Sequence, residues 1–209
     1  MTPDEVRSLL LRKKTKRDGQ RNIGPSEIGG CKAKVWHRIA GTPATNPGTL
    51  SLAANMGTAI HSWIEKTLDG NERFLLETRV ERDGIVGHVD CFDTETNQVV
   101  DWKTTKLSGI PYFPSQQQRW QVQVYGWLFS SVRQVDSVCL VAIARDGSER
   151  DIVTHVEPYS EAVALEALAW LDGVRALSSS PRPEKPKKFC RDYCQFFDPT
   201  GVVGCPSKG

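Results

Sequence analysis

The stretch Ile85–Thr104, IVGHVDCFDTETNQVVDWKT, decides the fold of this chain. Two apolar segments flank the polar cluster Thr94–Asn97, a pattern that is typical of two strands joined by a turn. With the turn centred on that cluster, residues of an antiparallel pair face each other when their numbers sum to 191. Asp90 then lies directly opposite Asp101. Like charges that face each other across a strand pair are destabilising, and a divalent cation is the best reason to place them there.

Lys103 follows Asp101 by two residues, so the two side chains point to the same face of one strand. Near a bound metal, its ammonium group could hold an attacking water or stabilise charge that develops on a phosphate. Trp102, between them, offers a backbone carbonyl. An Asp-x-Lys triplet alone often reflects only the polarity of a solvated strand. Opposite Asp90, however, the triplet indicates a magnesium or manganese site.

Further elements extend outward from this hairpin. Strand patterns cover residues 74–82, 85–93, 98–104, 135–144 and 150–156, with Asp83-Gly84 as a hairpin turn. Helical periodicity covers residues 4–14, 28–39, 53–68, 115–131 and 160–177, with Ser26 as the N-cap of the second helix. The order of helix, three-strand meander, helix, two strands and helix predicts an α/β fold with a mixed central sheet flanked by helices.

Two pairs of residues, each four apart on a predicted helix, point toward the hairpin. Gly57 and His61 form the first pair, and Glu65 continues their face. The apolar residues of this helix should pack on the sheet: Ile60, Trp63, Ile64 and Leu68. His61 could therefore reach the metal site as a neutral ligand, although a satisfied core histidine is an alternative.

Gln121 and Tyr125 form the second pair, with Arg119 nearby. An amide and a phenol on one helix face can bind a phosphate oxygen or orient a neighbouring metal ligand. The alternative is an ordinary helix surface with one packed tyrosine.

The cysteines divide into two groups. Cys91 and Cys139 lie in apolar strand segments and should be buried, whereas four others lie near the chain ends among Gly, Pro and charged residues: Cys31, Cys190, Cys194 and Cys205. The chain shows no signal-peptide core and no run near the roughly 18 apolar residues of a membrane span, so we expect a cytoplasmic protein. Because cytoplasmic thiols stay reduced, the second group indicates metal ligands rather than disulfides.

The net charge is +2, but charge is unevenly distributed. Two flanks are basic: residues 1–40 carry ten Lys/Arg and four acids, and residues 181–191 carry five Lys/Arg and one acid. The centre is acidic, because residues 69–101 carry nine acids and three arginines. Basic flanks around an acidic centre suit metal chemistry on a bound polyanion, although solvated basic tails would give the same pattern. Arg12–Arg17 and Lys185–Lys188 could hold a DNA backbone. Trp36, Tyr112 and Trp120 could stack bases or belong to the core.

Together these motifs resemble the RecB-like branch of the PD-(D/E)xK nuclease superfamily. Four motifs carry the resemblance, in the family's order: Gly57-Thr-Ala-Ile-His61, Gly87-His-Val-Asp90, Asp101-Trp-Lys103 and Gln121-Val-Gln-Val-Tyr125. The resemblance implies a restriction-endonuclease-like core that cuts DNA with Mg²⁺ or Mn²⁺. It implies that His61, Asp90, Asp101 and the carbonyl of Trp102 bind the metal, and that Lys103 is catalytic. It also implies that Gln121 and Tyr125 support the site or the DNA.

One cysteine on an early helix and three in the tail resemble the family's iron–sulfur subgroup, which includes CRISPR-associated exonucleases, the AddB nuclease domain and stand-alone phage exonucleases. This implies a 4Fe–4S cluster that joins a C-terminal cysteine tail to an N-terminal helix. The tail cysteines are separated by three and ten residues, where the subgroup has about two and five, so zinc stays an alternative occupant. Cys31 and Cys190 are 159 positions apart, and either metal centre should stabilise the fold by several kcal/mol.

We therefore expect a single nuclease domain over residues 1–209. Its parts are an iron–sulfur staple (residues 26–40 and 181–206), a catalytic core (53–157) and a C-terminal helix (160–178). The expected function is that of a DNA exonuclease that favours single-stranded ends, in a bacterium or phage-infected cell. It would have a recombination or helicase partner and no membrane association. The alternatives are an endonuclease of the same fold and a non-catalytic DNA-binding or recombination adaptor.

Overall fold

The computed structural model describes residues 2–3, 6, 23–46 and 52–208. Apart from Val6, the predicted helix over residues 4–14 lies outside the described residues, as does the basic segment Arg12–Arg17. The chain divides into two compact units. The sheet unit consists of Gly24–Gly29 and Ala59–Asp172, and the cysteine unit consists of Met1–Ile23, Gly30–Thr58 and Gly173–Gly209.

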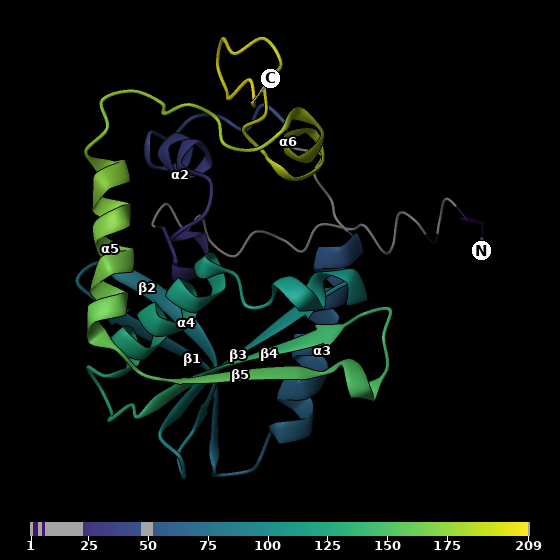
Figure 1. Cartoon of the computed structure of the whole chain (residues 1–209), viewed down its shortest axis with the longest axis vertical. Helices are drawn as coiled ribbons and strands as arrows, with labels where there is room; N and C mark the ends of the chain where they lie inside the picture. Colours follow the sequence, from purple (N-terminus) through teal and green to yellow (C-terminus); the bar gives the residue numbers. More distant parts are fainter. Residues whose placement is uncertain (1, 4–5, 7–22, 47–51, 209) are drawn as a thin grey trace. The chain divides into compact units, whose positions relative to one another are not determined.

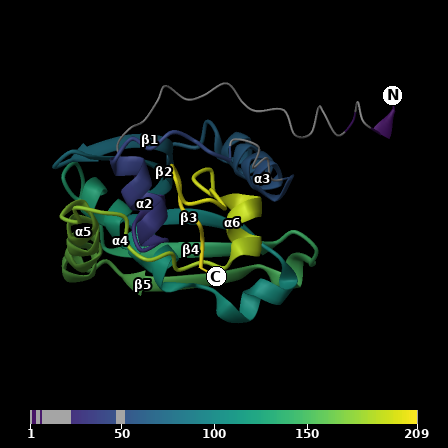
Figure 2. The same ribbon diagram turned by 90° about the horizontal axis from the view of Figure 1, so that it is seen from above.

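Five strands form the sheet, in the order in which they follow one another in the chain. They are β1 (Phe74–Arg82), β2 (Ile85–Asp93), β3 (Gln98–Thr105), β4 (Ser137–Ala144) and β5 (Val153–Pro158). Figure 2 shows this order across the sheet. All neighbouring strands are antiparallel except β3 and β4, which are parallel and are joined through a helix. The predicted mixed sheet flanked by helices is confirmed.

Eight helical segments lie in the described part of the chain (Figure 1). They are η1 (Pro25–Glu27), α2 (Lys32–Ile39), α3 (Leu52–Leu68), η2 (Leu107–Tyr112), α4 (Gln116–Phe129), η3 (Glu149–Asp151), α5 (Glu161–Arg175) and α6 (Lys187–Tyr193). Ser115 caps α4 by accepting a hydrogen bond from the backbone N–H of Gln118, whose side chain accepts in return from the N–H of Ser115. Within the described residues, none of these helices has the length and apolar character needed to cross a membrane.

The hairpin between β2 and β3 has the predicted register. Cys91 pairs with Val100, Phe92 with Val99 and Asp93 with Gln98, so the numbers of each pair sum to 191. In the turn between β1 and β2, Asp83 and Gly84 have φ values of 50° and 75°. Two consecutive left-handed residues match the twist of the flanking strands and make the tight hairpin that this dipeptide predicts.

The sheet unit has buried side chains on both faces of the sheet. On one face α4 is buried from Gln121 to Phe129, and the ring of Phe129 stacks on that of Phe92 with centroids 4.3 Å apart. A second cluster consists of Cys91, Val100, Cys139 and Val141, against which Leu68 and Trp102 pack. The prediction that Cys91 and Cys139 are core residues is confirmed.

Three expected features are wrong. Ser26 does not cap a helix: the helix begins only at Lys32, with Cys31 as its N-cap, because Gly29 turns the chain with a φ of 77°. Trp63 is 68% exposed and does not pack on the sheet. No residue of α3 is fully buried, and Leu68 of this helix packs against the cluster that contains Cys91. The last strand begins at Val153 instead of residue 150, because a 3-10 turn over Glu149–Asp151 precedes it.

In the cysteine unit the C-terminal tail lies against α2 and the segment that follows it (Figure 1). The buried ring of His37 stacks on Phe196 with centroids 5.8 Å apart. The side-chain amide of Asn46 donates to the carbonyls of Arg191 and Cys194 at 2.8 and 3.1 Å. The hydroxyl of Thr45 donates to the carbonyl of Phe197 at 3.1 Å. The predicted return of the tail onto an N-terminal helix is therefore present.

Candidate active site

Asp90, near the middle of β2, is the centre of a polar cluster in the sheet unit. Its Oδ2 accepts a hydrogen bond of 3.0 Å from the backbone N–H of Trp102 on β3. Nδ1 of His61 lies 3.5 Å from the same oxygen. The α3 helix thus delivers His61 to the strand that carries Asp90, as the Gly-x-x-x-His and Gly-x-x-Asp motifs indicated.

Glu77 is a member of this cluster that the sequence analysis missed. One donor atom from each of His61, Glu77 and Asp90 lies within 4.8 Å of the others, close enough for all three to hold one metal ion. Glu77 lies on β1 between Leu76, which pairs with Cys91, and Thr78, which pairs with Val89. This register places Glu77 opposite Asp90. Its φ of 43° is unusual for a residue within a strand.

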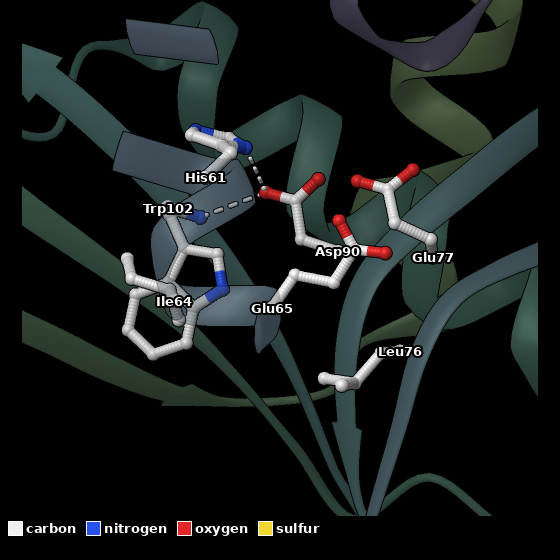
Figure 3. Close-up of a pocket in the computed structure, with 7 residues that line it drawn as sticks. All are labelled: His61, Ile64, Glu65, Leu76, Glu77, Asp90 and Trp102. Atoms are coloured by element: carbon white, nitrogen blue, oxygen red, sulfur yellow. Dashed lines mark hydrogen bonds and ion pairs between the residues drawn. The ribbon is translucent and has the colours of Figure 1, made fainter. Parts of the chain in front are cut away.

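A pocket surrounds this cluster. It is lined by His61, Ile64, Glu65, Leu76, Glu77, Asp90 and Trp102. Figure 3 shows the carboxyl groups of Glu65, Glu77 and Asp90 turned toward this pocket, with the imidazole of His61 beside them. The pocket therefore gathers oxygen donors and one ring nitrogen, which is a donor set that suits a divalent cation.

Asp101 on β3 has a side chain that is 2% exposed and is not among the residues that line this pocket. Its Oδ1 accepts a hydrogen bond of 3.0 Å from the side-chain amide of Gln121 on α4. Its Oδ2 forms an ion pair of 2.6 Å with Nζ of Lys103, whose side chain is 21% exposed. Gln121 is thus buried and orients a candidate ligand, so the alternative of an ordinary helix surface is wrong at this position.

The electrostatic environment of Asp90 is unfavourable to its charge. Burial raises the pKa of Asp90 to about 7, with contributions from the nearby charge of Asp101 and, to a smaller extent, that of Glu77. The hydrogen bond from Trp102 and the charge of Lys103 act in the opposite direction without balancing these effects. The cluster therefore carries more negative charge than its neighbours compensate, which is the condition that a bound cation relieves.

Tyr125 packs beside the two aspartates. Burial and the charges of Asp101 and Asp90 raise its pKa well above the usual range, so its phenol stays protonated near neutral pH. Gly87 makes room for this side chain: a Cβ at position 87 would lie 2.7 Å from Cε1 of Tyr125. The glycine of the Gly-x-x-Asp motif is thus explained by the close approach of the α4 tyrosine to β2.

The four terminal cysteines come together in the cysteine unit. None is in a disulfide, and three are buried while Cys31 is half-buried. Burial raises the pKa of Cys190 to about 11, and the charges of Cys194, Cys205 and Cys31 contribute to this rise, so the four sulfurs lie within electrostatic reach of one another. Among the described residues, no three of these sulfurs have mutual distances of 4.8 Å or less.

The ten residues between Cys194 and Cys205 form an ordered loop. The carboxylate of Asp198 accepts hydrogen bonds from the backbone N–H groups of Thr200, Val203 and Gly204 at 2.9, 3.0 and 3.1 Å. A hydrogen bond of 2.6 Å from the hydroxyl of Thr200, together with these backbone bonds, holds the pKa of Asp198 well below its usual range. The N–H of Cys205 then donates to the carbonyl of Phe196 at 2.7 Å. The long spacing thus returns Cys205 to the neighbourhood of the other cysteines.

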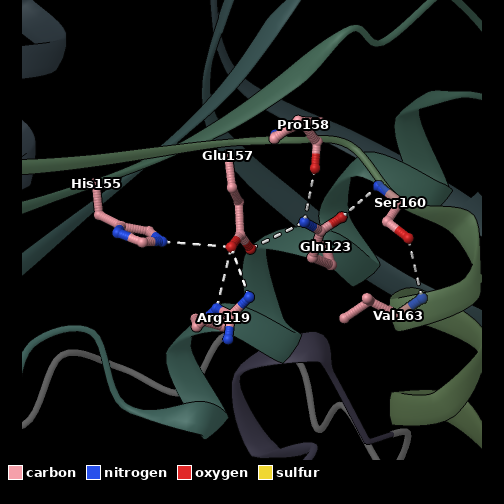
Figure 4. A network of polar contacts seen from close by, with 7 residues as sticks. All are labelled: Arg119, Gln123, His155, Glu157, Pro158, Ser160 and Val163. Atoms are coloured by element: carbon pink, nitrogen blue, oxygen red, sulfur yellow. Dashed lines mark hydrogen bonds and ion pairs between the residues drawn. The ribbon is translucent and has the colours of Figure 1, made fainter.

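Other residues singled out by sequence are not members of the metal cluster. Arg119 binds Glu157 on β5 through Nε and Nη2 at 3.0 and 2.8 Å, in a network with Gln123 and His155 (Figure 4). The ring of Trp120 contacts that of Trp170, and the indole N–H of Trp36 donates to the carbonyl of Leu177. The remaining residues singled out, Tyr112 and Lys185–Lys188, are exposed.

These features define the class of fold: a mixed five-stranded sheet flanked by helices, as in exonucleases with a PD-(D/E)xK-like fold. LHK-Exo, an alkaline exonuclease from Laribacter hongkongensis, matches with a TM-score of 0.54 and 12% identity, over 75% of this chain and 87% of that one. Its complex with dAMP matches with a TM-score of 0.54 and 11% identity, over 83% and 91% of the two chains.

A structure of the protein SSO0001 matches with a TM-score of 0.66 and 23% identity, over 98% of both chains. At these identities the likeness is one of fold. No family model matches the sequence, and no curated protein does.

Proposed function

We propose that this chain is a deoxyribonuclease that depends on a divalent metal and hydrolyses phosphodiester bonds at DNA ends. The observation that carries the proposal is the arrangement of two aspartates and a lysine on β2 and β3. Burial and the charge of Asp101 raise the pKa of Asp90, and Lys103 contacts Asp101 from the same strand. A folded protein gains nothing from two carboxylates that disfavour each other's charge unless a cation or a reaction requires them.

The residues present fit a magnesium or manganese ion. Asp90 and Glu77 would provide oxygen ligands and His61 a nitrogen ligand, since donor atoms of these three lie within reach of one ion. Asp101 and the carbonyl of Trp102 would complete the ligand set. The pKa of about 7 for Asp90 supports this assignment, because burial and the charge of Asp101 disfavour its ionised form, which a bound cation would favour. When bound, such an ion lowers the pKa of a coordinated water and neutralises charge on the phosphate.

The side chains of α4 and β3 would prepare the site for that chemistry. The amide of Gln121 holds one oxygen of Asp101, which leaves the carboxylate a single orientation. Lys103 is more exposed than Asp101. Its ammonium group can therefore reach a phosphate oxygen or an attacking water while it keeps its ion pair with the carboxylate of Asp101. Tyr125 would contribute a neutral hydroxyl, since its raised pKa keeps the proton in place.

We further propose that the four cysteines hold a 4Fe–4S cluster. Four free thiols that lie close enough for three of them to raise the pKa of Cys190 are a suitable ligand set. The same four thiols could hold a zinc ion, which stays the alternative occupant. The Asp198 loop explains how the unusual spacing still brings Cys205 to the group.

Exonuclease action with a preference for single strands is part of the same proposal. LHK-Exo, which shares the fold, is described as an alkaline exonuclease and has been crystallised with dAMP. Most of the described chain belongs to the sheet and its covering helices, so contacts with DNA would be mainly to phosphates and would carry no sequence information. A recombination or helicase partner would then select the DNA in the cell.

The test is digestion of linear single-stranded, linear duplex and covalently closed circular DNA, with Mn²⁺ and with EDTA. We expect Mn²⁺-dependent loss of the linear substrates, single strands first. Asp101→Ala and Lys103→Ala should abolish digestion, while Lys103→Ala should still bind Mn²⁺. Asp93→Asn is the control, because Asp93 is a buried carboxylate of β2 that pairs with Arg73 away from the site.

Two results would contradict the proposal in different ways. Equal nicking of closed circles would make the protein an endonuclease. Absence of any metal-dependent cleavage would leave a non-catalytic DNA-binding module that keeps the fold.

A further inference from the structure

The outer face of α6 carries two exposed aromatic side chains. Phe189 and Tyr193 are four residues apart, so they lie next to each other on one face of the helix. They are 46% and 53% exposed, and their ring centroids are 5.0 Å apart with an interplanar angle of 39°. The same helix buries Cys190, and the aromatic pair is no part of the buried cluster of Cys190, Cys194, Phe196 and Phe197.

Positive charge surrounds this aromatic pair. Residues 182–193 contain five Lys/Arg and two acids. The carboxylate of Glu184 accepts a hydrogen bond from the backbone N–H of Lys32, and Asp192 forms an ion pair with Arg191. Nζ of Lys185 lies 5.9 Å from the centroid of the Phe189 ring, and Lys187 and Lys188 are exposed on the first turn of α6. The face therefore combines apolar rings with ammonium groups in a small area.

This combination fits one kind of partner. An apolar protein surface would leave the lysines without anions, and a small anion would not use the rings. A single strand of DNA offers both phosphates and unpaired bases, and each base has a flat face that stacks on an aromatic ring whatever its identity. Duplex DNA offers phosphates only, because its bases are already stacked on one another.

We propose that the face of α6 formed by Phe189, Tyr193, Lys185 and Lys188 is a binding site for single-stranded DNA. Bases stack on the two rings, and the ammonium groups bind the neighbouring phosphates. The inference rests on the proposed function, since it assigns a second contact to the same substrate, and it gives the preference for single strands a physical cause. Stacking contributes to single strands alone, whereas the lysines attract both forms of DNA.

The experiment measures binding by the full chain as purified, with its metal centre, using fluorescence anisotropy in EDTA so that no DNA is cut. The probes are a labelled 20-nucleotide oligothymidylate and a duplex of the same length. The double variant Phe189→Ala/Tyr193→Ala should lose at least about tenfold in affinity for the single strand. Its affinity for the duplex should change less than about twofold.

Matched variants separate stacking from other effects. Phe189→Tyr and Tyr193→Phe keep the rings and should bind the single strand as the wild type does. Trp63→Ala removes an exposed aromatic side chain from α3, which is no part of this face, and should also have no effect. Lys185→Ala/Lys188→Ala should weaken binding to both probes and reduce the salt dependence of the affinity.

A second measurement does not depend on the folding of any variant. Wild-type protein should bind an abasic oligonucleotide, which has phosphates and no bases, at least about tenfold more weakly than the oligothymidylate. Equal affinity for the two oligonucleotides would overturn the proposal. So would a double variant Phe189→Ala/Tyr193→Ala that binds the single strand with wild-type affinity, or that loses the same factor in affinity for the single strand and for the duplex. If the wild type bound neither probe, the proposed nuclease function would fail as well. If it digested DNA while the alanine pair bound normally, only the α6 site would fail.

Discussion

Removing divalent cations should make the stability of this protein depend on pH through one carboxyl group, that of Asp90. The pKa of Asp90 in the folded, metal-free protein is about 7, against a usual value of 3.8. The folded chain therefore keeps this proton up to a higher pH than the unfolded chain. Between pH 4 and 7 the folded state binds more protons, so its free energy of unfolding falls as the pH rises through this range.

The size of the effect follows from the difference between the two pKa values. Each unit corresponds to about 1.4 kcal/mol, so the full penalty above pH 7 is about 4 kcal/mol. Between pH 5.5 and 8 the free energy of unfolding falls only over the interval from pH 5.5 to about 7, which corresponds to about 2 kcal/mol. In a chain of this size that loss lowers the melting temperature by about 4–8 °C. His37 acts in the opposite direction, because burial lowers its pKa and its protonation destabilises the fold at low pH.

The assay is thermal unfolding at pH 5.5 and 8 in EDTA, for the wild type and for Asp90→Asn. The difference between the two proteins isolates Asp90 from His37 and other groups. The variant should lose the Asp90 contribution and be more stable than the wild type at pH 8. The control Asp93→Asn should be destabilised equally at both pH values. Arg73 lowers the pKa of Asp93 to about 2, so its contribution is lost only as the pH falls toward that value. Mn²⁺ should stabilise the wild type more at pH 8 than at pH 5.5.

The reasoning would be refuted if Asp90→Asn showed the same pH dependence as the wild type in EDTA. Stabilisation by Mn²⁺ that was equal at both pH values would refute it too, because a cation that binds the carboxylate must compete with the proton.

Two other predictions concern single positions. Gly87→Ala should lower the free energy of unfolding in urea by about 1–3 kcal/mol, because its Cβ would lie 2.7 Å from the ring of Tyr125; Gly173→Ala, with open space around its Cβ, should be neutral or slightly stabilising. The purified protein should be brown, with visible absorbance that bleaches on reduction. Cys190→Ala should lose iron and colour, whereas Cys91→Ala should retain both, and a colourless wild type with stoichiometric zinc would contradict the cluster assignment.

Much of the hairpin that carries the aspartates could be predicted, because its signals are local. Strand periodicity and turn residues suffice to predict the register of β2 against β3, which the structure has over three pairs, from Asp93–Gln98 to Cys91–Val100. The same argument applied to the Asp83-Gly84 turn gives pairs that sum to 167, which places Glu77 opposite Asp90. The signal for this missed residue was therefore present in the sequence, although its left-handed φ was not.

Features that depend on packing could not be predicted in this way. The exposure of Trp63 depends on which stripe of α3 packs, and helical periodicity allows several. The start of α2 depends on Gly29, where a Cβ would lie 2.7 Å from the ring of Trp120 on a helix 91 positions later. Arg119 lies two positions before Gln121 in the sequence, but the residue that it binds, Glu157, is 38 positions later on β5. Such pairs arise only when the tertiary structure is formed.

The two glutamines of α4 restrict how that helix can move on the sheet. Gln121 and Gln123 are two residues apart, so they point to different sides of the helix, one to Asp101 on β3 and the other to Glu157 and the carbonyl of Pro158 on β5. Rotation of α4 about its axis, or sliding along it, would stretch contacts on both strands at once. A substitution at the β5 end, such as Glu157→Ala, would remove the contacts of Gln123 and Arg119 with this side chain and so weaken, without abolishing, the β5 restraint on the helix that orients Asp101. Its effect would appear as a looser carboxylate on β3, at a distance from the change.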